Sequence, residues 1–137
     1  AAGPFSAYPG IDRVIMLLQG GAMRLRIGGE TRALRANEPF AFDGRAPVDC
    51  EIDSPTRDLN LMTLRDLATG SMTVLRGDTA TQVGGDEDAL VVIGLADGAV
   101  AGGMRLTALD SVIADDALEV TGHAAVITIR LAARSLP

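Results

Sequence analysis

The sequence lacks lysine and tryptophan, and it has only one cysteine and one histidine among 137 residues. The single cysteine, Cys50, excludes an internal disulfide and favours a reducing cytoplasm as the compartment. With only three Phe and one Tyr, the core must be built from Leu, Val, Ile, Ala and Met. The longest apolar run, residues 14–18, is too short to span a bilayer. We therefore expect no membrane association.

Positive charge is also sparse, and all of it is carried by arginine. Twelve Arg oppose eighteen Asp and Glu, which gives a net charge of −6. The arginines are scattered along the chain, whereas nucleic-acid binding requires a clustered positive field. The sequence therefore argues against a nucleic-acid partner.

Few side chains are available to bind a metal ion or to act as a nucleophile. Transition metals prefer imidazole and thiolate ligands, and here His123 and Cys50 are far apart in the sequence. We expect no metal ion and no other cofactor, with His123 in a turn near the surface. Cys50 lies between Asp49 and Glu51, whose carboxylates raise the pKa of a thiol. A buried core residue is the favoured interpretation of this cysteine.

Alternation of apolar and polar residues with a period of two predicts half-buried β-strands. Residues 22–27 alternate, with Met23, Leu25 and Ile27 pointing inward. Gly28-Gly29 then predicts a two-residue hairpin, because glycine accepts a positive φ at little cost. The return strand, residues 30–35, is polar and is expected at a sheet edge.

The rest of the chain has the same pattern of short strands and turns. Further strands are expected at residues 11–18, 48–52, 58–63, 71–76, 89–95, 105–113, 117–120 and 124–131. Turns or irregular segments are expected at residues 1–10, 40–44, 66–70, 78–88 and 97–103. No stretch of ten or more residues has a capped helical period. The sequence therefore predicts an all-β sandwich or barrel.

The two faces of the strand at residues 58–63 differ in character. One face carries Asp58, Asn60 and Met62, and the other carries Leu59, Leu61 and Thr63. If the leucine face is the core, Asp58 and Asn60 are solvated. If the interior of the sheet holds a ligand, these two residues line it.

Four short motifs carry a resemblance to a known family. They are Gly3-Pro4-Phe5-Ser6, Tyr8-Pro9-Gly10-Ile11-Asp12-Arg13, Phe42-Asp43-Gly44 and Asp58-Leu59-Asn60-Leu61-Met62. In this order and spacing they resemble the HutD/Ves family of metal-free bicupins, which are associated with histidine-utilisation operons. The resemblance implies a single cupin-like domain of two stacked β-sandwich halves, residues 1–65 and 66–137.

The family usually carries some tens of residues before the Gly-Pro-Phe-Ser motif, including a Lys-Asn-Gly-Gly-Gly motif, and this sequence has none of them. A barrel without its first strands exposes an unpaired edge. We therefore expect a homodimer, or a separate N-terminal fragment, to complete the barrel.

The polar residues of the motifs define the candidate ligand-binding site. It comprises Arg13, Phe42, Asp43, Asp58, Asn60 and Arg65. In the structural interpretation, Arg13 pairs with Asp58 or Asp43, because a buried charge requires a partner. In the functional interpretation, Asp58 holds Arg13 while Asn60 faces a ligand that bears a carboxylate or an amide. Phe42 and Asp43 would then close the mouth of the site.

Three functions remain open at this point. The resemblance implies a non-catalytic regulatory protein that senses a small carboxylate-bearing metabolite, such as the histidine-degradation intermediate N-formylglutamate. One alternative is a metal-free cupin isomerase, epimerase or lyase, in which Asp or Glu is the base. The other is a structural or assembly β module whose interior is filled by side chains. A polar pocket would argue against the third function, and a carboxylate with a raised pKa in it would favour the enzyme.

Overall fold

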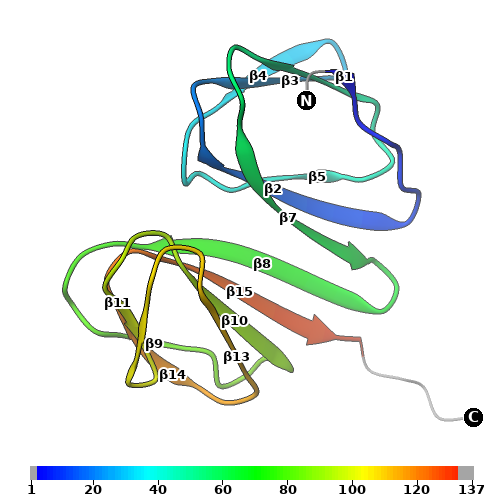
Figure 1. Cartoon of the computed structure of the whole chain (residues 1–137). Coiled ribbons are helices and arrows are strands. Elements are labelled where there is room, and N and C mark those ends of the chain that lie inside the picture. The colour runs from blue at the N-terminus through cyan, green and yellow to red at the C-terminus, as the bar shows by residue number, and fades with distance from the viewer. Residues whose placement is uncertain (1–2, 133–137) are drawn as a thin grey trace, which may run out of the picture. The chain divides into compact units, whose positions relative to one another are not determined.

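The computed structural model describes residues 3–132, and within that range the regular structure is all β (Figure 1). The expected all-β class is therefore confirmed. Contacts along the chain divide it into two compact units, residues 1–66 and 67–137. None of the described residues forms a helix of the length and apolarity that a membrane crossing requires.

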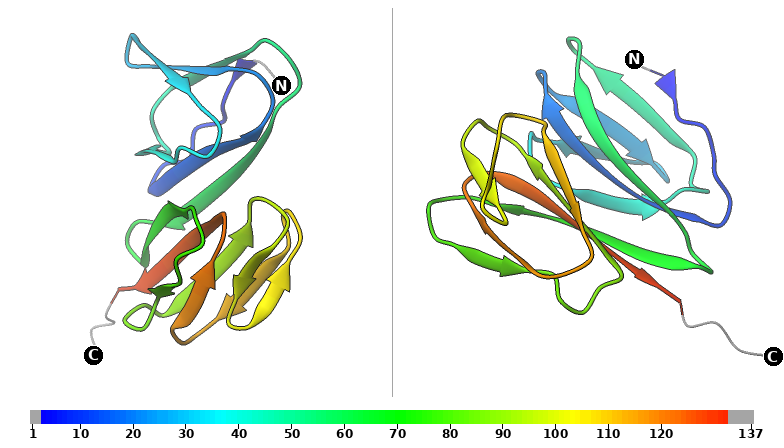
Figure 2. Two further views of the ribbon diagram at one scale, coloured as in Figure 1. Left: turned by 90° about the vertical axis from the view of Figure 1, so that its left-hand side faces the viewer. Right: turned by 60° about the horizontal axis from the view of Figure 1, so that its bottom comes forward.

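The first unit is a sandwich of two antiparallel sheets. Its strands are β1 (Gly3–Pro4), β2 (Ile11–Gln19), β3 (Met23–Ile27), β4 (Glu30–Leu34), β5 (Phe40–Asp43), β6 (Val48–Ile52) and β7 (Arg57–Leu64). One sheet has the order β1-β6-β3-β4 and the other the order β5-β2-β7. The two sheets form separate layers (Figure 2).

The core of the first unit lies between these two sheets. Its buried members are Ile15, Leu17, Met23, Leu25, Leu34, Val48 and Cys50. We call the face of each sheet that carries these residues its inner face. Aromatic rings pack around this core without being fully buried, so aliphatic and sulfur-containing side chains fill its centre, as the sequence predicts.

The second unit repeats the two-sheet plan. Its strands are β8 (Ala68–Leu75), β9 (Thr81–Val83), β10 (Ala89–Gly94), β11 (Ala99–Ala101), β12 (Met104–Leu106), β13 (Ser111–Ala114), β14 (Leu118–Thr121) and β15 (Ala124–Leu131). The sheets have the orders β13-β10-β15-β8 and β12-β11-β14-β9. The core between them comprises Leu90, Val92, Ala99, Ala101, Leu106, Val120, Ala124 and Val126.

Several local predictions are confirmed. Gly28 and Gly29 have φ of 59° and 83°, and they join β3 to β4 as a two-residue hairpin. Strand β4 is at the edge of its sheet. Cys50 is 3% exposed and belongs to the core. Gly10 has a φ of 75°, which a turn that follows Pro9 requires of its third residue.

Other local predictions are wrong, mostly where a strand is very short. Residues 40–43 do not belong to a turn, because Phe40–Asp43 pairs with β2, and the turn begins only at Gly44. The lead-in contains Gly3–Pro4, which pairs with β6. Strand β9 interrupts the loop expected at residues 78–88, and β11 interrupts the turn expected at residues 97–103. In segments of two to four residues, the alternation of apolar and polar residues is too short to identify a strand when its partner strand is unknown.

The expected strand at residues 105–113 is two strands joined by a turn. Leu109 has a φ of 70°, which an extended strand does not allow. Asp110 stabilises the turn by accepting hydrogen bonds from the backbone N–H and the hydroxyl of Thr107, at 3.0 and 2.6 Å. Strand β8 also begins earlier than expected, at Ala68 within the predicted connector.

Candidate functional site

Arg13 is the only charged side chain among the buried residues of the described range, and it is 6% exposed. It lies on β2, two residues before Ile15, so its side chain is on the inner face of the sheet. Burial lowers the pKa of Arg13, and the nearby Tyr8 and Asp58 act in the opposite direction. The first unit therefore holds a guanidinium at the margin of its apolar core.

Three aromatic rings lie against this guanidinium. The Cζ of Arg13 is 4.9 Å from the ring centre of Phe42, 5.2 Å from that of Phe5 and 5.6 Å from that of Tyr8. A cation over an aromatic face gains about 2 kcal/mol when the pair is desolvated. The rings thus stabilise the charge of Arg13 without neutralising it.

The polar contact of Arg13 is with the edge strand β7. Its Nη2 donates to Oδ1 of Asn60 at 2.8 Å, and Nδ2 of Asn60 donates to Oδ1 of Asp58 at 3.0 Å. In the β2–β7 register Asn60 is opposite Ile15 and Asp58 is opposite Leu17. Because paired residues share a face, the polar face of β7 is its inner face.

The register thus places the polar residues of β7 on the inner face, while Leu59 and Leu61 on its other face are half-buried. Asp58 and Asn60 are nevertheless exposed, and Met62 is 42% exposed, because β7 is an edge strand. The inner face is therefore open to solvent at this edge.

The expected ion pair between Arg13 and Asp58 or Asp43 is wrong. Arg13 takes part in none of the ion pairs found within residues 3–132. In the β2–β7 register Met62 is opposite Arg13, Asn60 is the next residue along that face, and Asp58 lies one step further. The role assigned to Asp58 from the sequence thus belongs to Asn60, which accepts the hydrogen bond of Arg13. Asp58 in turn accepts a hydrogen bond from Asn60.

Asp43 and Arg65 belong to a different, exposed cluster. Nη2 of Arg65 lies 2.7 Å from Oδ1 of Asp12 and 3.1 Å from Oδ1 of Asp43. The backbone N–H of Arg45, and then Arg65, lower the pKa of Asp43. Phe42 is opposite Arg13 in the β2–β5 register, so the next residue, Asp43, projects from the opposite face. Of the six predicted site residues, four come together: Arg13, Phe42, Asp58 and Asn60.

Three contributors to the site were missed at the sequence level: Phe5, Tyr8 and Gly44. A Cβ on Gly44 would lie 2.6 Å from the backbone oxygen of Ile11, so only glycine fits there. The N–H of Tyr8 donates to the oxygen of Gly44 at 2.7 Å, which fixes the segment that carries Tyr8. The sequence did contain one indication of this aromatic cluster, because all four aromatic residues of the chain lie within residues 5–42.

A hollow of about 270 Å³ adjoins the site through Phe42. It is lined by Ile27, Glu30, Arg32, Phe40, Ala41 and Phe42. The rings of Phe40 and Phe42 are stacked with centres 5.9 Å apart. Phe42 therefore contacts Arg13 and also forms a wall of the hollow.

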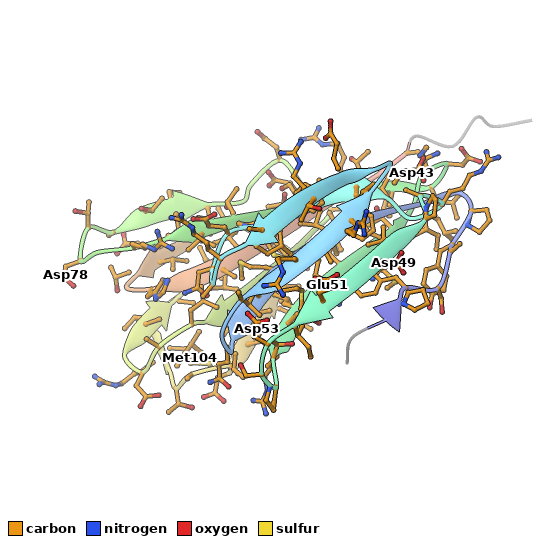
Figure 3. All side chains as sticks on the ribbon, turned by 90° about the horizontal axis from the view of Figure 1, so that it is seen from above. Asp43, Asp49, Glu51, Asp53, Asp78 and Met104 are labelled. Carbon is orange, nitrogen blue, oxygen red and sulfur yellow. The ribbon has the colours of Figure 1, made fainter. Side chains whose placement is uncertain are left out.

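On the outer face of β6, two of three acidic residues are paired with Arg24. Asp49, Glu51 and Asp53 follow one another along β6 and just after its end (Figure 3). Arg24 lies 3.4 Å from Oε2 of Glu51 and 2.9 Å from Oδ1 of Asp53. Across residues 3–132 no three His, Cys, Asp or Glu side chains are grouped in a way that could hold a metal ion.

Cys50 and His123 take no part in the hydrogen bonds that join Arg13, Asn60 and Asp58. Burial is the main cause that raises the pKa of the Cys50 thiol, and the nearby Asp58 and Glu51 carboxylates add to it. His123 is in the second unit, where its Nε2 is buried without a hydrogen-bond partner. Burial, and then Arg76, lower the pKa of His123.

Comparison with known proteins gives consistent results. A family model described as HutD matches residues 1–132. Protein Ves of Citrobacter koseri is 40% identical over 67 residues, which are 47% of this chain and 35% of that protein. An uncharacterized 21.2 kDa protein in the hutC 3′ region of Pseudomonas putida is 40% identical over 63 residues, which are 44% of this chain and 33% of that protein. The matched segments thus span about a third of these curated relatives.

The fold also matches a solved structure, that of HutD from Pseudomonas fluorescens SBW25. The TM-score is 0.87 at 29% identity, over 96% of this chain and 74% of that one. This match confirms the cupin-like fold that the sequence resemblance implied.

Proposed function

This chain belongs to the HutD family, and from that premise we propose that it is a non-catalytic sensor of a carboxylate-bearing metabolite of histidine utilisation. The carboxylate binds at Arg13, on the inner face of the first unit. An N-acyl amino acid such as N-formylglutamate is the proposed ligand. The name of the Pseudomonas putida relative, which mentions the hutC region, supports this metabolic setting.

One observation carries the proposal, namely that the buried charge of Arg13 has no counter-ion among residues 3–132. Within residues 3–132 its one hydrogen-bond partner is the neutral amide of Asn60, and its Nε is buried without a partner. A buried charge is costly unless it is paired. A structural brace would have placed a carboxylate against the guanidinium, whereas a carboxylate-binding site leaves that position for the ligand.

The residues around Arg13 fit a ligand that also carries an amide. Asn60 retains a second N–H, and Asp58 retains a second carboxylate oxygen, beyond the hydrogen bond that joins them. The first group donates to a carbonyl and the second accepts from an N–H, and an N-acyl group offers both. The rings of Phe5, Tyr8 and Phe42 provide an apolar surround that strengthens these polar contacts.

Isothermal titration calorimetry with N-formyl-L-glutamate tests the proposal directly. The informative variant is Asn60→Asp, which places a carboxylate next to Arg13 and so occupies the position proposed for the ligand. We expect saturable binding to the unaltered protein, and binding to Asn60→Asp weakened about tenfold or more. The folded state of Asn60→Asp should be as stable as the parent or more stable.

The matched control is Asn37→Asp, which makes the same chemical change at the only other asparagine of the chain. Asn37 has a φ of 65°, a conformation that aspartate also tolerates. Equal affinity in Asn60→Asp and Asn37→Asp would remove Arg13 from the binding role. Chemical change of the ligand, followed by NMR, would instead favour an enzyme with a carboxylate base.

A further inference from the structure

The second unit has a polar hollow of its own, on the same face of its sheet as its core. The hollow measures about 250 Å³ and is lined by Thr69, Gly70, Ser71, Glu87, Thr128 and Arg130. We propose that it is a second ligand site that takes a small zwitterion of the α-amino-acid class, with the carboxylate at Arg130 and the ammonium at Glu87. This site is separate from the one at Arg13.

Strand register places the hollow on the inner face of the β13-β10-β15-β8 sheet. Thr128 is opposite both Leu90 and Ser71, and Leu90 is 2% exposed in the core of the second unit. Arg130 and Thr69 are the next pair on that face. The apolar inner face thus becomes polar where β15 and the edge strand β8 run past the core.

The two charged residues of the hollow are not paired with each other. Arg130 and Glu87 form no ion pair within residues 3–132, although both line the same hollow. Arg130 is exposed and Glu87 is half-buried. A ligand with one negative and one positive group, set a few ångströms apart, satisfies both.

The loop that carries Glu87 is fixed to the strand that carries Arg130. The N–H of Asp88 donates to the oxygen of Ile129 at 2.9 Å, and the N–H of Leu131 donates to Oδ2 of Asp88 at 2.6 Å. These two hydrogen bonds involve the residues on either side of Arg130, so they hold the loop of Glu87 near Arg130. Neither bond uses the guanidinium of Arg130. The backbone segments that carry the two charged residues are therefore preorganised, which reduces the entropic cost of binding.

Hydroxyl groups complete the lining between the charges. Ser71 and Thr128 share a hydrogen bond of 2.5 Å, in which either oxygen is able to donate. Each hydroxyl offers one donor and two acceptor positions, so the pair retains capacity for a ligand. This lining suits a small polar ligand and not an apolar one.

The first unit has the same plan, which supports a binding role for the second. In both units an arginine lies on the inner face of a strand next to an edge strand, Arg13 beside β7 and Arg130 beside β8. The adjacent edge strand presents Asn60 in one case and Ser71 in the other. The difference is burial, since rings surround Arg13 whereas Arg130 is open to solvent.

The test is a chemical-shift titration of the ¹⁵N-labelled protein with three probes. L-Alanine carries both charges, acetate carries the negative charge alone, and ethylammonium carries the positive charge alone. We expect saturable shifts with L-alanine at the amides of Ser71, Glu87 and Thr128, weaker binding of acetate, and the weakest binding of ethylammonium. Non-saturating shifts with L-alanine, or equal affinity for L-alanine and acetate, would overturn the zwitterion site.

Three variants assign the roles of the charged groups. Arg130→Gln should weaken L-alanine binding about tenfold or more, and Glu87→Gln should abolish the preference for L-alanine over acetate. Arg105→Gln is the matched control, because Arg105 is also an exposed arginine of the second unit but does not line the hollow. The exposed position of Arg130 makes a folded variant the expected outcome, and the spread of the amide spectrum verifies it. An Arg130→Gln protein that binds L-alanine as well as Arg105→Gln does would refute the proposal.

Discussion

Arg13 donates its hydrogen bond to the amide oxygen of Asn60, at 2.8 Å, and not to a carboxylate. An amide positions the guanidinium as well as a carboxylate does, but it leaves the positive charge uncompensated. The hydrogen bond of Asp58 goes to the amide nitrogen of Asn60 and not to Arg13. Asn60 therefore fixes the position of the Arg13 guanidinium without neutralising its charge.

Replacement of Asn60 and of Asp58 by alanine should have unequal effects on stability. Asn60→Ala removes the hydrogen-bond acceptor of a buried guanidinium, which costs about 1–3 kcal/mol. Asp58→Ala removes one hydrogen bond at an exposed position, which costs about 0.5–1.5 kcal/mol. Urea unfolding of both variants measures the difference. A larger loss in Asp58→Ala would mean that this carboxylate supports Arg13 directly in solution.

Gly44→Ala should destabilise the first unit and disturb the aromatic surround of Arg13. The new methyl group would lie 2.6 Å from the oxygen of Ile11 and 3.3 Å from Cδ of Arg13. Overpacking of this kind costs about 1–3 kcal/mol, and thermal unfolding with tyrosine fluorescence reports it. Gly21→Ala is the control, because its closest neighbour is the side-chain oxygen of Ser54 at 3.1 Å, which is able to rotate away. Equal melting temperatures would contradict the close approach at Gly44.

Cys50 should react with thiol reagents only after the first unit opens. The side chain is 3% exposed, and burial raises the pKa of its thiol, so the reactive thiolate is scarce in the folded state. Iodoacetamide labelling followed by mass spectrometry should be slow in buffer and should accelerate through the urea transition. Because the chain has one cysteine, the label reports on the first unit alone. Rapid labelling of the native protein would show that the core is open.

Stability should decrease as the pH falls below about 6.5, and His123 should account for the change. Burial lowers the pKa of His123 in the folded state relative to an unfolded value of about 6.5. The unfolded chain therefore binds the proton more readily, so folding is favoured above pH 6.5 and loses stability as the pH falls toward the folded pKa.

Urea midpoints at pH 7.5 and 5.5 measure this effect. His123→Gln should remove most of the difference, because no other histidine is present to titrate in that window. An unchanged difference in His123→Gln would assign the pH dependence to other groups.

The longer strands could be predicted from the sequence, because the alternation of apolar and polar residues within one strand is visible without knowledge of its partner strand. Strands β3 and β7 lie where residues 22–27 and 58–63 are expected to be extended, and Met23, Leu25 and Ile27 lie in or against the core as predicted. Strands β1, β9 and β11 were missed because two or three residues do not define a period. Their extended form comes from neighbouring strands, which only the tertiary structure supplies.

The candidate site could be predicted only in part, because its contacts also depend on how the strands pair. Alternation places Asp58 and Asn60 on one face, but the choice between core and solvent depended on the β2–β7 register. The same register decides that Asn60, and not Asp58, meets Arg13. Phe5 and Tyr8 lie in an irregular segment between β1 and β2, where no periodic pattern indicates the direction of a side chain.

The hydrogen bond from Arg13 to Asn60 joins residues 47 positions apart in the sequence. Hairpins such as β3–β4 close over two residues and form early, whereas β7 reaches β2 only after the intervening chain is ordered. We therefore expect the acceptor of Arg13 to be put in place later than the β3–β4 hairpin during folding. A ligand that requires both residues will not recognise a nascent or partly folded chain. By mass action such a ligand increases the population of molecules in which β7 has docked.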